Sequence, residues 1–188
     1  MKKLVAAMLC LALSLMCAVG LANEKIDPSE LQIGVIMIGD TSDMGFNYSH
    51  LVGLQEMQKN LGIEDHQITI LENVADDSTC ADAISELISN GCNVIIGNSF
   101  GFQTYMYEAA AQHPEVLFCH YSGLLQNDTN FCRFNARNYQ TRYLQGIAAA
   151  MRSESGKIGF VGAFKNAEVN VSLNAYALGA QSVNPDVT

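Results

Sequence analysis

Short apolar runs alternate with segments of helical spacing along most of this sequence, and this alternation restricts the fold more than any other feature. Residues 33–38 contain only apolar residues and one glycine, which is typical of a strand buried on both faces of a parallel sheet. Similar runs predict four more strands, and the segments between them predict helices. The predicted strands cover residues 32–39, 67–72, 93–97, 116–119 and 131–134, and the predicted helices cover residues 51–61, 78–90 and 102–112. The pattern indicates an α/β domain with a parallel sheet flanked by helices.

The same pattern begins again after Phe134. The predicted elements there are a helix over residues 138–152, a buried strand over residues 157–162 and a helix over residues 168–182. One strand and two helices do not cover both faces of a parallel sheet. We therefore expect a complete N-terminal α/β lobe over residues 23–135. Residues 136–188 are expected to form only the start of a second α/β lobe, in a truncated chain.

The first 22 residues are typical of a secretory signal peptide. Two lysines precede an apolar run over residues 4–16, and small residues follow it. This run is shorter than the roughly 18 apolar residues that a membrane span requires. We expect cleavage between Ala22 and Asn23 and an extracytoplasmic location such as the periplasm. The alternative is a lipid anchor on Cys17, which Met16 disfavours because lipoprotein signals place a small residue before that cysteine.

Charge and motifs exclude several classes of function. The net charge of −9 becomes −11 when Lys2 and Lys3 leave with the signal peptide. An acidic protein is poorly suited to nucleic acid and to anionic membrane surfaces, because both require clustered Lys and Arg. No nucleophile elbow, H-E-x-x-H zinc motif or phosphate-binding loop occurs. The carboxylate pair Asp76 and Asp77 precedes a predicted helix and is interpreted as its cap. We expect neither an enzyme nor a cofactor or metal site.

Four cysteines follow the signal peptide, and none has the spacing of a metal ligand. Cys80 and Cys92 are expected near opposite ends of one helix, too far apart for a disulfide. Cys119 and Cys132 lie on consecutive predicted strands and are the better candidates for a disulfide in an oxidising compartment. A pair of buried thiols is the alternative.

Five segments in order resemble the BMP family of ABC-transporter solute-binding proteins, the group of basic membrane lipoproteins that includes purine nucleoside receptors. They are the strand and loop of residues 33–47, GCNVIIGNSFG at residues 91–101, FCHYSG at residues 118–123, the segment of residues 133–146, and the segment of residues 156–185. The resemblance covers almost the whole chain after the signal peptide. Two residues depart from the pattern of the family. Met16 precedes the possible lipidation site, and Thr104 stands where many relatives have Asp.

The resemblance implies a type I periplasmic-binding-protein fold, in which two α/β lobes are joined by a hinge and close on a ligand. It also implies that the ligand is a purine nucleoside or nucleobase, bound without chemistry and delivered to an ABC permease in the inner membrane. We expect a monomer. Two rival interpretations are a truncated remnant that binds nothing and, less in keeping with the motifs, a secreted nucleoside hydrolase.

Candidate ligand-binding residues follow the ends of the predicted strands. Right-handed crossovers place the carboxyl ends of parallel strands at one edge of the sheet, where ligands bind. After the first strand, Phe46 offers a ring to stack on a purine, and Asp43 and Asn47 offer hydrogen-bonding groups. The alternative is a helix N-terminus, with Asp43 as the capping residue and Phe46 as its hydrophobic staple.

The other candidates follow later strands or begin the last helix: Ser99, Phe100, Gly101, His120, Tyr121 and Glu168. Each has a structural alternative. Turns between strands and helices need small residues in any case, and a lone histidine serves structure more often than binding. A glutamate in a first helical turn interacts favourably with the helix dipole. Arg133 and Arg142 flank the crossover and are expected to form salt bridges that hold the hinge.

Overall fold

The computed structural model describes residues 26–188. The described residues fall in two units, one that ends at Glu30 and one that comprises Leu31–Thr188. In the first unit, the short 3-10 helix η2 (Pro28–Glu30) begins where the Asp27 carboxylate accepts a hydrogen bond from the backbone N–H of Ser29, at 2.9 Å. The predicted signal peptide, its cleavage site and the alternative anchor at Cys17 lie outside the described residues. Among residues 26–188, no helix is both long enough and apolar enough to cross a bilayer.

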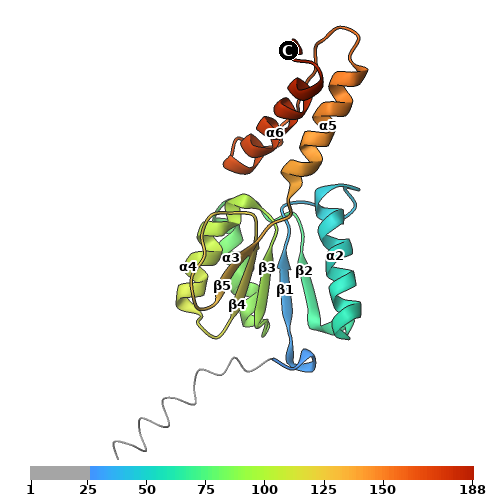
Figure 1. Cartoon of the computed structure of the whole chain (residues 1–188). Helices are drawn as coiled ribbons and strands as arrows, with labels where there is room; N and C mark the ends of the chain where they lie inside the picture. Colours follow the sequence, from blue (N-terminus) through green and yellow to red (C-terminus); the bar gives the residue numbers. More distant parts are fainter. Residues whose placement is uncertain (1–25) are drawn as a thin grey trace, which may run out of the picture. The chain divides into compact units, whose positions relative to one another are not determined.

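The second unit contains a parallel five-stranded sheet with the order β2-β1-β3-β4-β5 (Figure 1). Its strands are β1 (Ile33–Ile36), β2 (Ile68–Leu71), β3 (Val94–Gly97), β4 (Leu117–Tyr121) and β5 (Phe131–Phe134). All five predicted strands are therefore confirmed. Because every pairing is parallel, the loops that follow the strands meet at one edge of the sheet.

The predicted helices of the first lobe are also present. They are α2 (Phe46–Leu61), α3 (Ser78–Ser89) and α4 (Gln103–Gln112), with short 3-10 helices η3 (Asp65–Gln67) and η4 (Phe100–Phe102). Gly62 ends α2 in the left-handed conformation with a φ of 69°, as expected for a residue without a side chain. The Asp77 carboxylate caps α3 by accepting a hydrogen bond from the N–H of Thr79. The interpretation of Asp77 as a cap is confirmed.

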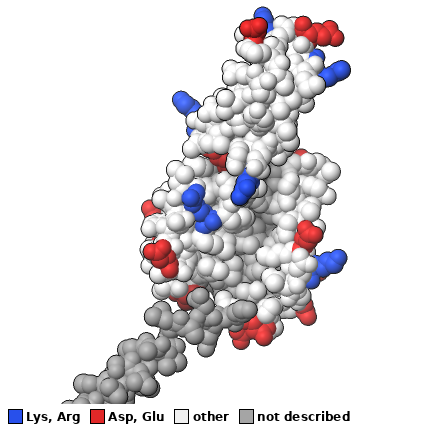
Figure 2. All heavy atoms as spheres, in the orientation of Figure 1, with Lys and Arg blue, Asp and Glu red and all other residues white. Residues whose placement is uncertain are grey.

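The two faces of the sheet are covered unequally. Helices α3 and α4 pack on one face, around a cluster that includes Leu87, Met106 and Phe118. On the other face, α2 is the only helix among residues 26–188 that packs against the sheet, and its Leu54 contributes to a smaller cluster. This second face keeps a groove of about 890 Å³ that runs beside α2 as far as Phe134. Figure 2 shows the groove as a hollow lined mostly by uncharged side chains.

Two helices follow the sheet, α5 (Asn138–Arg152) and α6 (Ala167–Val183), and they pack closely against each other. Glycine permits this closeness. A Cβ atom on Gly146 would lie 1.9 Å from the carbonyl oxygen of Tyr176, and a Cβ atom on Gly179 would lie 2.0 Å from the carbonyl oxygen of Tyr143. The backbones of α5 and α6 are therefore almost in contact at these two positions.

The predicted strand at residues 157–162 is wrong. The segment belongs to no strand, and Val161 is 98% exposed. Its described backbone hydrogen bonds join Ile158 and Gly156 to Thr188 rather than to a sheet. A buried strand needs neighbours on both sides, and no strand among residues 26–188 pairs with this one. The part after residue 135 is thus a pair of helices here, without a sheet of its own.

Candidate ligand-binding site

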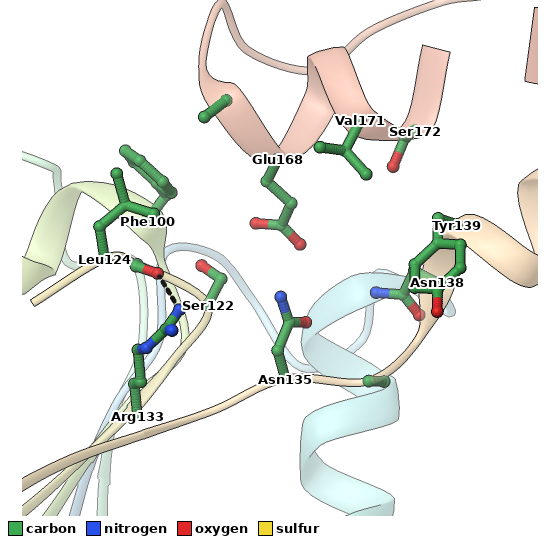
Figure 3. Close-up of a pocket in the computed structure, with 13 residues that line it drawn as sticks. Phe100, Ser122, Leu124, Arg133, Asn135, Asn138, Tyr139, Glu168, Val171 and Ser172 are labelled. Carbon is green, nitrogen blue, oxygen red and sulfur yellow. Dashed lines mark hydrogen bonds between the residues drawn. The ribbon is translucent and has the colours of Figure 1, made fainter. Parts of the chain in front are cut away.

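Loops from three strands and the beginning of α6 surround a cavity of about 170 Å³ at the carboxyl edge of the sheet (Figure 3). Phe100 lies after β3, Ser122 after β4 and Asn135 after β5, while Glu168 comes from the first turn of α6. The full lining is Phe100, Ser122, Gly123, Leu124, Arg133, Asn135, Ala136, Asn138, Tyr139, Ala167, Glu168, Val171 and Ser172. This is the edge at which the sequence predicts a ligand.

The Asp43 carboxylate binds N–H groups in the first turn of α2, whose N-cap residue is Gly45. One carboxylate oxygen accepts hydrogen bonds from the N–H groups of Gly45, at 2.8 Å, and Tyr48, at 2.9 Å. The other accepts from the backbone and side-chain N–H groups of Asn47, both at 2.9 Å. The backbone N–H donors, led by that of Tyr48, hold the pKa of Asp43 well below its usual range. The capping alternative therefore describes the contacts of Asp43, and a ligand role for it stays a prediction.

Asn47 is buried and fastens two strand ends together. Its side-chain oxygen accepts hydrogen bonds from the side-chain N–H of Asn98, at 2.9 Å, and from the backbone N–H of Gly39, at 3.3 Å. The side-chain oxygen of Asn98 in turn accepts from the backbone N–H of Ile38, at 3.0 Å. The amide groups of Asn47 are thus engaged within the protein. Asn98 begins the segment of residues 98–101 that the sequence places after the third strand, but it was not among the predicted ligand residues.

His120 and Ser99 form a buried support beneath the edge. The Nε2 of His120 lies 2.7 Å from the carbonyl oxygen of Ser99, and the Ser99 hydroxyl donates to a carboxylate oxygen of Asp76, at 3.0 Å. Burial lowers the pKa of His120, so the ring is neutral near pH 7 and donates its Nε2 proton to Ser99. His120 is fully buried and does not line the cavity. Gly101 sits against the Asp76 carboxylate, where a side chain would collide.

Three aromatic rings gather beside the cavity. Phe46 meets the His50 ring edge-on at 4.7 Å and the Tyr121 ring at 5.9 Å. The Phe46 ring is 44% exposed, and Phe46, His50 and Tyr121 all line the 890 Å³ groove. The Tyr121 hydroxyl accepts a hydrogen bond from the side-chain N–H of Asn138, at 2.7 Å, which ties β4 to the first residue of α5.

The structure separates the predicted site residues into groups. Phe100 and Glu168 line the cavity, whereas Phe46 and Tyr121 line the neighbouring groove. The other predicted residues line neither: Asp43, Asn47, Ser99, Gly101 and His120. Ser122, Asn135 and Asn138 are among the cavity residues that sequence reasoning missed. Ser122 directly follows β4 and Asn135 directly follows β5, and these positions were the available signal for the two.

The expected salt bridges of the two arginines are not present. Arg133 donates to the carbonyl oxygen of Gly123, at 3.3 Å, and to the side chain of Gln126, at 3.2 Å. Arg142 donates to the side chain of Gln145, at 2.8 Å. Within residues 26–188, neither guanidinium lies within 4.0 Å of a carboxylate. Both arginines therefore bind neutral oxygens.

Cys119 and Cys132 occupy paired positions of β4 and β5, with their Sγ atoms 3.4 Å apart. All four described cysteines are free thiols in this structure. Burial, and next the neighbouring Cys132, raise the pKa of Cys119 to about 12. The predicted disulfide is therefore not formed here, although its two sulfur atoms are adjacent.

Comparison with known proteins yields one family match. Residues 30–188 match the family model described as ABC transporter substrate-binding protein PnrA-like. A purine-binding protein of Brucella abortus is 37% identical over 165 residues, which are 88% of this chain and 45% of that protein. A putative ABC transporter glucose-binding protein of Haloferax volcanii is 35% identical over 154 residues, 81% of this chain and 38% of that protein. An ABC transporter nucleoside-binding protein of Lactococcus lactis is 28% identical over 148 residues, 78% of this chain and 42% of that protein.

Solved structures support the fold. A solute-binding protein of an ABC transporter system from Aeropyrum pernix superposes with a TM-score of 0.71 at 18% identity, covering 82% of this chain and 44% of that one. A transcriptional activator of the comK gene from Bacillus halodurans gives a TM-score of 0.62 at 26% identity, covering 82% of this chain and 51% of that one. This chain spans about half the length of the proteins that it matches.

Proposed function

The chain belongs to the family of PnrA-like ABC transporter substrate-binding proteins, and from this membership we propose that it binds a purine nucleoside or nucleobase outside the cytoplasm. The ligand is bound without chemical change and is passed to an ABC permease. Members of this family are substrate-binding proteins rather than enzymes. The Brucella relative carries the name of a purine-binding protein and the Lactococcus relative that of a nucleoside-binding protein.

The observation that carries this proposal is the cavity between the strand ends and α6. One wall belongs to the N-terminal lobe and the other, with Glu168, to the helices that follow the crossover. Two-lobed binding proteins close around a ligand by a hinge motion between their lobes. A ligand held here would touch both sides of the crossover, with the hinge at residues 135–137. We accordingly retain residues 23–135 as the first lobe and assign residues 136–188 to the second.

A purine also suits the aromatic side of the site. The exposed Phe46 ring lies at the groove next to the cavity, supported by edge contacts with His50 and Tyr121. Stacking of a base on an aromatic side chain contributes about 1–3 kcal/mol and tolerates any base. Phe46 is therefore the residue that we assign to the base, with Asp43 acting mainly by holding the N-terminus of α2 in place.

A sugar is the second candidate ligand. The Haloferax relative is named as a putative glucose-binding protein, and its identity to this chain is close to that of the Brucella relative. Hydroxyl, amide and carboxylate groups around the cavity are suited to sugar hydroxyls. A binding experiment must therefore include a free sugar.

Isothermal titration of the chain with inosine, guanosine, adenosine, adenine and glucose tests the proposal. We expect heat from at least one purine ligand and none from glucose. Heat from glucose alone would transfer the assignment to the second candidate. No heat from any of the five would refute both and favour the interpretation of a chain that binds nothing.

We also propose that residues 1–22 direct export and are cleaved before Asn23. N-terminal sequencing of the protein recovered from the periplasm of an expressing bacterium tests this. A chain that begins at Asn23 is the expected result. A chain that begins at Met1, or one that begins at a lipid-modified Cys17, would contradict it.

A further inference from the structure

One buried hydroxyl at the cavity has no partner within the described part of the protein. Ser122 is 2% exposed, and its Oγ forms no hydrogen bond with any of residues 26–188. Figure 3 shows this hydroxyl at the cavity, in the space below Glu168. Buried polar groups are almost always hydrogen-bonded, and an unpaired one is destabilising. A hydroxyl left unpaired at a cavity wall points to a partner that comes from outside the chain.

The backbone holds Ser122 in an unusual conformation. Its φ is 66°, in the left-handed region, and the next residue, Gly123, has a φ of 64°. Residues other than glycine adopt this region at an energetic cost, and such residues are concentrated at functional sites. The N–H of Ser122 donates to the carbonyl oxygen of Phe134, at 2.9 Å, which fixes the turn to β5. The hydroxyl is thus held toward the cavity by a strained but anchored turn.

The turn is also supported from below. A Cβ atom on Gly123 would lie 2.5 Å from the Nδ1 atom of His120, so the turn rests directly on that buried ring. The ring is itself held by its 2.7 Å contact with the carbonyl oxygen of Ser99. The next residue, Leu124, donates its N–H to the side chain of Gln103, at 2.9 Å. Ser122 therefore has little freedom to find another partner.

The other groups at the cavity restrict the chemistry of the ligand. Glu168 offers carboxylate oxygens, and Asn135 offers a neutral amide. The positive group of Arg133 is directed to the carbonyl oxygen of Gly123. A carboxylate repels phosphate, and an apolar group would leave the Ser122 hydroxyl unpaired. A sugar ring satisfies both conditions, because it is uncharged and its neighbouring hydroxyls can pair with the Ser122 hydroxyl and with the Glu168 carboxylate.

We propose that Ser122 is a specificity-determining residue that hydrogen-bonds a sugar hydroxyl of the ligand, while Glu168 accepts a hydrogen bond from a neighbouring hydroxyl. This inference rests on the proposed function and narrows it. Of the two purine classes, it selects the nucleoside over the free nucleobase, and it excludes the nucleoside phosphates.

Substitution S122G in the full chain isolates the hydroxyl. Glycine adopts a φ of 66° without strain, so this variant removes the side chain and leaves the turn intact. The matched control is N73G, because Asn73 has a φ of 57° and does not line the cavity. Both variants and the original chain are titrated with inosine, hypoxanthine, 2′,3′-dideoxyinosine and inosine monophosphate, and their thermal unfolding is recorded.

We expect the original chain to bind inosine more tightly than the other three compounds. S122G is expected to weaken inosine binding about five- to tenfold, because the loss of one hydrogen bond has an effect of this size. Its affinity for hypoxanthine and its melting temperature are expected not to fall. N73G is expected to bind all four compounds as the original chain does. Equal binding of inosine and hypoxanthine, or the same loss for both in S122G, would overturn this inference and leave the proposed function standing. If the original chain bound neither purine, both proposals would fall.

Discussion

Gly146→Ala should destabilise the protein although it replaces a helical glycine by the best helix former. Gly146 lies inside α5, where the change to alanine by itself would stabilise the helix by about 1 kcal/mol. The new Cβ atom, however, would lie 1.9 Å from the carbonyl oxygen of Tyr176 in α6. Ordinary contacts between carbon and oxygen are about 3.3 Å or longer. The two helices would have to separate by more than an ångström, because neither contacting group is a flexible side chain.

The magnitude follows from these opposing effects. Overpacking that moves backbone costs about 1–3 kcal/mol, and a backbone carbonyl places this site at the upper end of that range. After the gain in helix propensity is subtracted, the net destabilisation is about 1–2 kcal/mol. In a protein of this size, that lowers the melting temperature by roughly 2–8 °C.

Gly53→Ala is the matched control. Gly53 lies inside α2, and a Cβ atom built on it has nothing within 4 Å. Here only the helix propensity changes, so G53A should stabilise by about 0.5–1 kcal/mol. Urea unfolding of both variants, followed by circular dichroism at 222 nm, yields the two changes in free energy. If G146A stabilised the protein as much as G53A does, the close contact between α5 and α6 would be refuted.

Three further predictions concern the sheet and the loops that follow its strands. D43N should lower the melting temperature at pH 7. The folded-state pKa of Asp43 is depressed, so its stabilisation is fully present above the unfolded pKa and is lost as the pH falls toward the folded value. The melting temperatures of D43N and the original chain should therefore begin to approach each other below about pH 3.8. A constant difference down to the most acid pH would contradict this. N98A leaves the N–H of the half-buried Ile38 without its partner and should cost about 1–3 kcal/mol in urea unfolding. An unchanged midpoint would show that the network is dispensable. Glutathione disulfide should convert the thiols of Cys119 and Cys132 into a disulfide with release of two glutathione molecules, because their Sγ atoms are adjacent. Peptide mapping should find this cross-link in the original chain and not in C132S. Two persistently free thiols in the original chain would refute the pairing.

Much of the first lobe was predictable because its signals are local. The five strands are short apolar runs, and such runs are recognisable wherever the strand is buried on both faces. The end of α2 at Gly62 and the cap of α3 at Asp77 were predictable for the same reason, since each depends on one residue and its immediate neighbours. The family resemblance rests on the same local segments.

The candidate site was predicted less well, because residue type does not reveal which groups are already satisfied. Asn47 is a suitable ligand residue by its chemistry, yet its amide is engaged by Asn98, which lies 51 residues away in the sequence. His120 ends a strand as expected, but the fold buries it beneath the turn at Gly123. The position of Ser122 directly after β4 was its one signal in the sequence, but its burial without a hydrogen-bond partner is visible only in the fold.

The sequence by itself determined the parallel α/β architecture and predicted a ligand at the carboxyl edge of its sheet, because strand periodicity and the handedness of crossovers depend on the chain locally. Only the tertiary structure decided the state of residues 157–162, the contacts of Asp43 and the burial of the unpaired Ser122 hydroxyl. A strand exists only where neighbours pair with it, a carboxylate becomes a cap only where N–H groups reach it, and a hydroxyl becomes available to a ligand only where the rest of the protein leaves it unpaired.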